Sequence, residues 1–110
     1  IGIWLKRIMK SNEFSIELSD EAQIDFDKSY NYFFKESPKI ADTFFKKINK
    51  SFEDIKRNPF VFPVAYQEEV RKFVVNKYPF IIYYQVVNSK INVIAIFHTS
   101  RNPEIWNERI

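Results

Sequence analysis

Apolar and polar positions alternate, or recur at helical spacing, over most of the chain. Residues 14–18 (FSIEL) alternate as a half-buried strand does. Ser19 follows as a helix N-cap, with acidic residues in the first turn, where the helix dipole favours them. One face of this predicted helix carries apolar side chains at spacings of four, four and three residues: Ala22, Phe26, Tyr30 and Phe33. We expect the helix to end before Pro38.

A second helix begins with the same kind of signal. Ser37 serves as the cap, and Pro38 lies in the first turn, where its missing N–H costs nothing. The helix then carries a continuous apolar stripe formed by Ala41, Phe44, Phe45, Ile48, Phe52 and Ile55. Residues 57–59 (RNP) end it, so the two helices are predicted to form an antiparallel hairpin with a tight turn.

The second half of the chain reads as a sheet. We expect the loop at 60–67 (FVFPVAYQ) to lie across the core, because it contains many large apolar groups. Strands follow at about 70–75, 80–87 and 91–97, and Asn88 and Ser89 form the last hairpin turn. Residues 80–87 are apolar on both faces, which predicts a central strand.

These elements predict an α+β fold of order βααβββ. Four strands form an antiparallel sheet packed on the N-terminal helical hairpin, and a short C-terminal helix starts at residues 102–104 (NPE). The chain has 110 residues, of which 45% are hydrophobic, so one compact domain is expected. We assign residues 13–110 to this domain. Residues 1–12 are predicted to be an N-terminal extension or a cloning remnant, because the single methionine, Met9, is a candidate start.

The composition of the chain limits the kinds of binding site and partner that it can have. The chain has no cysteine and one histidine, which disfavours disulfides and zinc sites, and we expect no metal or cofactor. The net charge of +3 suits an anionic partner such as nucleic acid or an acidic protein. No apolar run approaches the ~20 residues of a membrane span, so we predict a cytoplasmic protein without membrane contact.

Two groups of basic residues are candidate binding surfaces. On the second helix, opposite the apolar stripe, a basic ridge is formed by Lys39, Lys46, Lys50 and Arg57. A solvated helix face is the favoured interpretation of this ridge, and contact with phosphates or acidic side chains is the alternative. The second group, Arg71, Lys72 and Lys77, precedes the central strand. Arg71 is interpreted equally as a side chain snorkelling at a sheet edge or as a guanidinium that clamps a phosphate.

The histidine lies at a strand end, where the sequence changes to "HTSR". Strict alternation places His98 on the face of Ile94 and Ile96. A lone histidine here is more often a structural hydrogen-bonding group than a catalyst, but imidazole also suits proton transfer near neutral pH. With Arg101 close behind and Arg71 across the sheet, His98 is a candidate for work at a phosphoryl centre.

Four segments carry a family resemblance: "IELSDEAQIDF", "FFKKINKSFEDIKRNPFVFP", "VRKFVVNKYPFIIYYQV" and "INVIAIFHTSRNPEIW". Together they resemble the RelE/ParE superfamily, the toxins of bacterial type II toxin–antitoxin modules. The "FHTSR-x-P-x-x-W" ending is similar to that of the ParE-like branch, often called plasmid stabilisation proteins. The resemblance implies an acidic, partly disordered antitoxin that folds on the toxin.

RelE-like members of the superfamily cut messenger RNA on the ribosome without metal. Under this resemblance Arg71 matches an arginine of the family's second strand, His98 lies near a catalytic position, and Arg101 would stabilise charge. The chain departs from the pattern because residues 79–80 (PF) occupy the place of another arginine. No acid is clearly placed as the base, and Glu68 and Glu69 are candidates.

ParE-like members instead inhibit DNA gyrase by binding it. Under that reading His98 and Arg101 are structural, with Trp106 packed beneath them, and the missing arginine fits. An inactive remnant kept for autoregulation is a third alternative. The sequence places an mRNA endoribonuclease slightly ahead of a gyrase inhibitor, because Arg71, His98 and Arg101 can converge.

Overall fold

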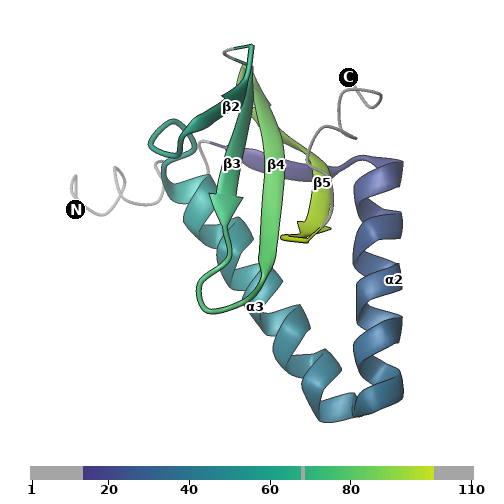
Figure 1. Ribbon diagram of the computed structural model, residues 1–110. Coiled ribbons are helices and arrows are strands. Elements are labelled where there is room, and N and C mark those ends of the chain that lie inside the picture. Colours follow the sequence, from purple (N-terminus) through teal and green to yellow (C-terminus); the bar gives the residue numbers. More distant parts are fainter. Residues whose placement is uncertain (1–13, 68, 101–110) are drawn as a thin grey trace, which may run out of the picture.

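Two helices and five strands make up the part of the chain that the computed structural model describes, residues 14–67 and 69–100. The elements are β1 (Ser15–Leu18), α2 (Asp20–Glu36), α3 (Pro38–Arg57), β2 (Val64–Tyr66), β3 (Val70–Val74), β4 (Phe80–Val87) and β5 (Lys90–His98). One sheet of order β1-β5-β4-β3-β2 packs against the helical hairpin (Figure 1). The predicted α+β class is thereby confirmed. The predicted extension at 1–12 and the C-terminal helix lie outside the described residues.

Two serines set the ends of the helices as predicted. The Ser19 hydroxyl accepts the Ala22 N–H at 3.1 Å and starts α2. Ser37 ends α2, because its N–H donates to the Phe33 carbonyl at 2.9 Å. The Ser37 hydroxyl also accepts the Lys39 N–H at 3.2 Å, so one residue ends the first helix and caps the second. This single-residue connection forces the chain to reverse, and it produces the predicted hairpin.

The sheet differs from the prediction in strand number and direction. It has five strands, and β1 runs parallel to β5. The helical hairpin between β1 and the rest of the sheet returns the chain so that the first strand lies beside the last in the same direction. The additional strand, β2, forms in the segment predicted as a loop and pairs with β3 at the opposite edge. In that segment Phe62 packs on the core, whereas Phe60 and Val61 are exposed, contrary to expectation.

Both faces of the sheet contribute to the core. The helix-facing cluster joins helix and strand side chains: Ala22, Phe44, Ile48, Ile55, Phe73, Val75, Phe80, Ile82, Tyr84, Ile91, Val93 and Ile96. A smaller cluster on the second face contains Val70, Tyr83, Ile94, Ala95 and Phe97. The central place predicted for residues 80–87 is confirmed, since β4 is third of the five strands. Phe45, a member of the predicted apolar stripe, is instead 44% exposed.

A β-bulge in β5 changes which residues share a face. Tyr83 pairs with Ala95 and Tyr84 with Val93, so Ile94 is an extra residue. Ile94 therefore belongs to the second-face cluster, and the prediction that His98 shares a face with both Ile94 and Ile96 was wrong for Ile94. The N-terminal part of α2 holds the bulge: the Ser19 hydroxyl donates to the Ile94 carbonyl at 3.3 Å, and the Ile96 N–H donates to Asp25 at 3.0 Å.

Candidate functional site

The two candidate catalytic residues that are described lie at opposite ends of the sheet. Arg71 on β3 pairs with Tyr84, and His98 on β5 pairs with Phe80. The pairs are four residues apart on β4, which is about 13 Å along a strand, and β4 separates the two side chains laterally. The expected convergence of Arg71 and His98 is therefore absent. Arg101, the third predicted member, lies outside the described residues, as does Glu68.

The Arg71 guanidinium is already occupied. Its Nη1 donates to the Phe60 carbonyl at 3.0 Å and to the Phe62 carbonyl at 2.7 Å. The Phe60 ring also lies beneath the guanidinium, 5.5 Å from centroid to Cζ. Arg71 thus fastens the segment after α3 to the sheet. Glu69, a candidate base, lines a hollow of about 230 Å³ beside it.

Tyr84 is a buried polar residue that sequence reasoning missed. Its hydroxyl donates to the Pro59 carbonyl at 2.7 Å, and the side chain is fully buried. Burial raises the pKa of Tyr84 to about 12, and the nearby Arg71 charge offsets part of this rise. The available signal was a pair of tyrosines in an otherwise largely aliphatic central strand. Together Tyr84 and Arg71 hold residues 59–62 against the sheet.

His98 makes a local hydrogen-bond arrangement at the end of β5. Its Nδ1 accepts the Ser100 N–H at 3.1 Å, and the Ser100 hydroxyl lies 2.8 Å from the same atom. The neutral ring therefore carries its proton on Nε2, because an atom that accepts from an amide cannot carry the proton itself. The ring meets Phe80 edge to face at 5.4 Å. In this tautomer Nε2 is a donor that no described residue engages, and Ser100 engages the Nδ1 lone pair that a general base would use.

A cavity of about 430 Å³ opens beside His98, between α2 and the turn from β3 to β4. Its walls are mostly aromatic and are formed by Lys28, Ser29, Tyr32, Phe33, Tyr78, Pro79, Phe80 and His98. Sequence reasoning missed the contribution of α2 to this cavity. Lys28 and Tyr32 are one helical turn apart, and that spacing was the available signal.

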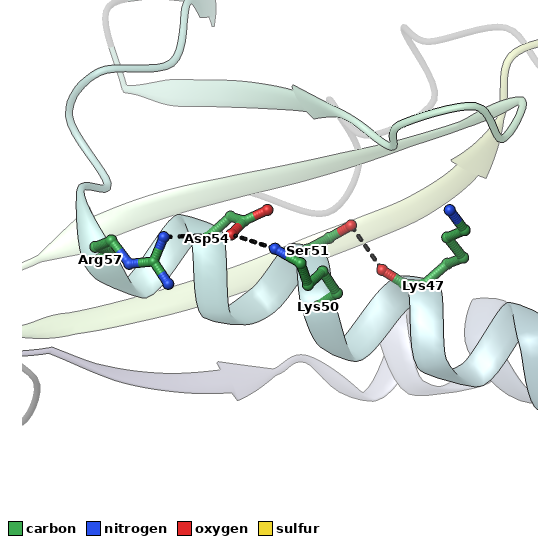
Figure 2. Close-up of polar contacts among 5 residues, drawn as sticks. All are labelled: Lys47, Lys50, Ser51, Asp54 and Arg57. Atoms are coloured by element: carbon green, nitrogen blue, oxygen red, sulfur yellow. Dashed lines mark hydrogen bonds and ion pairs between the residues drawn. The ribbon is translucent and has the colours of Figure 1, made fainter.

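The basic ridge predicted on α3 is largely neutralised by neighbouring acids. Lys46 pairs with Asp42 at 3.0 Å, and Asp54 pairs with both Lys50 at 3.2 Å and Arg57 at 3.8 Å. Figure 2 shows Asp54 between its two basic partners along α3. These ion pairs form because (i, i+3) and (i, i+4) neighbours on a helix are in reach of each other, and they fit the favoured interpretation of the ridge as a solvated helix face.

The three basic residues of the sheet also fail to form one surface. Arg71 lies on the helix-facing side, whereas Lys72 pairs with Tyr83 and shares the second face with it. Lys77 lies in the turn between β3 and β4, with a left-handed φ of 59°.

Within residues 14–67 and 69–100, no group of three or more His, Cys, Asp or Glu side chains is placed to hold a metal ion. None of the described helices has both the length and the apolar character needed to span a bilayer.

Comparison with known proteins gives one family and one structural likeness. Residues 16–103 match the family model described as the ParE toxin of the type II toxin–antitoxin system parDE. Curated proteins give no match. Among solved structures, the chain is similar to a chain of the chromosomal ParDE TA system from P. aeruginosa, with a TM-score of 0.69 at 19% identity. That likeness covers 80% of this chain and 98% of the other, and it supports the fold.

Proposed function

The chain belongs to the ParE family of toxins of type II toxin–antitoxin systems, and on this premise we propose that it inhibits bacterial growth by binding DNA gyrase. Gyrase inhibition is the activity that resemblance to the ParE-like branch implies. It needs a binding surface and no catalytic residues. Because gyrase acts in the cytoplasm, the proposal also places the toxin there.

The separation of Arg71 from His98 is the observation that supports binding over RNA cleavage. Cleavage through a ribose 2′-hydroxyl requires a proton acceptor, cations around the phosphorane and a proton donor at one centre. The Arg71 Nη1 donates to two backbone carbonyls, and the Nδ1 lone pair of His98 accepts the Ser100 N–H. These contacts support structural roles for both side chains, and they weaken the main argument for an endoribonuclease.

The cognate antitoxin is the second partner in this proposal. A toxin with a net charge of +3 attracts an acidic, partly disordered polypeptide, and folding of that polypeptide on the toxin blocks its action. The basic residues that sequence analysis selected, Lys46, Lys50, Arg57, Lys72 and Lys77, would act in this attraction as a diffuse field, because they do not form a single patch.

Supercoiling by purified DNA gyrase tests the proposal. We expect addition of the purified toxin to slow supercoiling of relaxed plasmid in a concentration-dependent way, and the His98→Ala variant to inhibit as the wild type does. The control is cleavage of messenger RNA on programmed ribosomes, where we expect no product. Full supercoiling at saturating toxin, together with ribosome-dependent cleavage that His98→Ala abolishes, would overturn the proposal in favour of an endoribonuclease.

A further inference from the structure

Within the described residues, β5 has no partner strand on one side beyond the point where β1 ends. β1 pairs with β5 only from Lys90 to Val93. At the next two edge positions the Ile94 carbonyl accepts from the Ser19 hydroxyl, and the Ile96 N–H donates to the Asp25 carboxylate. Thr99 donates its N–H to Pro79 at 2.8 Å on the β4 side. Because neighbouring residues of a strand direct their backbone groups to opposite sides, the N–H and C=O of His98 face away from β4. Among residues 14–67 and 69–100 none pairs with these two groups, so this short segment of sheet edge has no partner strand in the described part of the chain.

The aromatic cavity adjoins this open edge. His98 lines it from β5, and Tyr32, which is 63% exposed, lines it from α2. The Phe33 ring forms its inner wall, edge to face with Tyr78 at 6.4 Å and with Phe80 at 6.1 Å. A volume of about 430 Å³ accommodates an aromatic side chain, and buried aromatic anchors in such pockets dominate many protein interfaces.

The rim of the cavity has an uncompensated cation. Lys28 lines the cavity and forms no ion pair with any described residue, in contrast to Lys46 and Lys50 on α3. The carboxylate one helical turn before Lys28, that of Asp25, is buried and accepts the Ile96 N–H. The adjacent Asp27 accepts a hydrogen bond from the Gln23 side chain at 3.0 Å. His98 adds a hydrogen-bond donor through Nε2–H. These groups favour a ligand that brings a carboxylate next to an aromatic ring.

We propose that the aromatic cavity and the adjoining edge of β5 bind an extended acidic peptide segment. Its main chain hydrogen-bonds to His98, its aromatic side chain fills the cavity, and a neighbouring Asp or Glu contacts Lys28. The inference rests on the proposed function in one respect, since it takes this segment to belong to the antitoxin. A single-stranded nucleic acid would supply a ring and a phosphate but has no peptide group to pair with the strand edge.

The test uses a labelled ten-residue peptide with one Trp flanked by Asp and Glu, and measures its Kd for the full chain by fluorescence anisotropy. We expect Lys28→Glu and Tyr32→Ala each to weaken binding by about tenfold. Two matched controls lie on α3 outside the cavity, Lys39→Glu and Phe45→Ala, and we expect each to change the Kd by less than about twofold. A peptide with Ala in place of Trp should also bind about tenfold more weakly.

Hydrogen exchange of the His98 amide tests the strand pairing. We expect its exchange to slow when the peptide binds. A Kd that is unchanged in both Lys28→Glu and Tyr32→Ala, or a bound peptide that leaves the exchange rate of His98 unaltered, would overturn the inference. Displacement of the peptide by single-stranded RNA from these same residues would overturn it in favour of a nucleic-acid site. The peptide-binding and hydrogen-exchange experiments contain no gyrase. A failed supercoiling test would therefore not affect the conclusion drawn from them.

Discussion

A phenol hydroxyl lies within the helix-facing core at Tyr84, and its ionisation is coupled to folding. Burial raises the pKa of Tyr84 to about 12, above the value of about 10 for an exposed tyrosine. Burial also raises the pKa of Tyr83. The neutral phenol is therefore favoured in the folded chain. The stability that it contributes is complete below about pH 10 and is lost as the pH rises from about 10 to 12.

Tyr84→Phe should show this coupling. At neutral pH we expect the variant to lose about 1–2 kcal/mol of unfolding free energy, because the buried Pro59 carbonyl loses its donor. Between pH 10 and 12 the wild type should lose stability more steeply than the variant, by up to about 1.4 kcal/mol per pH unit. Urea denaturation at several pH values measures both effects, with Tyr32→Phe as an exposed control. Parallel pH profiles for wild type and Tyr84→Phe would contradict the assignment.

The sequence predicted the contacts of individual side chains less well than it predicted the helices. The ion pairs Asp42–Lys46 and Lys50–Asp54 were visible in the sequence as (i, i+4) spacings. The partners of Arg71 were not visible, because they are backbone carbonyls 9 and 11 residues away that any sequence would supply. A residue type alone therefore did not distinguish a phosphate clamp from a structural anchor.

At the level of elements, Asp25 connects α2 to the bulged strand. It is 6% exposed and accepts the Ile96 N–H at 3.0 Å. We expect Asp25→Ala to lower the free energy of unfolding by about 1–3 kcal/mol, because the Ile96 N–H is left without its acceptor inside the protein. Asp27→Ala is the matched control, since Asp27 makes an exposed bond to Gln23 on the same helix and should cost less than about 0.5 kcal/mol. Equal losses in urea denaturation would refute this role for Asp25.

The helices were predictable from sequence, whereas the direction and number of strands were not. Caps at Ser19 and Ser37 and a proline at position 38 set the helix ends locally, and the structure confirms them. The parallel pairing of β1 with β5 depends on residues about 75 positions apart, for which alternation gives no partner. The bulge at Ile94 likewise follows from contacts with α2, and it shifted the predicted face of that residue.

At the scale of the whole molecule, two adjacent phenylalanines of α3 test where the core lies, because Phe44 is buried and Phe45 is partly exposed. Phe44 is fully buried between the helices and the sheet, with rings of Phe26, Phe33 and Phe80 at 5.4, 5.1 and 5.0 Å. We expect Phe44→Ala to cost about 3–5 kcal/mol of unfolding free energy through the cavity that it leaves. Phe45→Ala removes a ring that is 44% exposed and should cost clearly less. Comparable midpoints of thermal unfolding for the two variants would show that the core is placed wrongly.

The parallel β1–β5 pair has a consequence for how the protein folds during synthesis. The α2–α3 hairpin contains only local contacts and can form as soon as it is made, but β1 must wait for β5. Until then the helices have no sheet on which to bury their apolar faces. Loop closure over this separation slows folding, so we expect a time constant of milliseconds to seconds instead of microseconds. A toxin fragment whose synthesis ends before β5 therefore lacks the strand that completes its core.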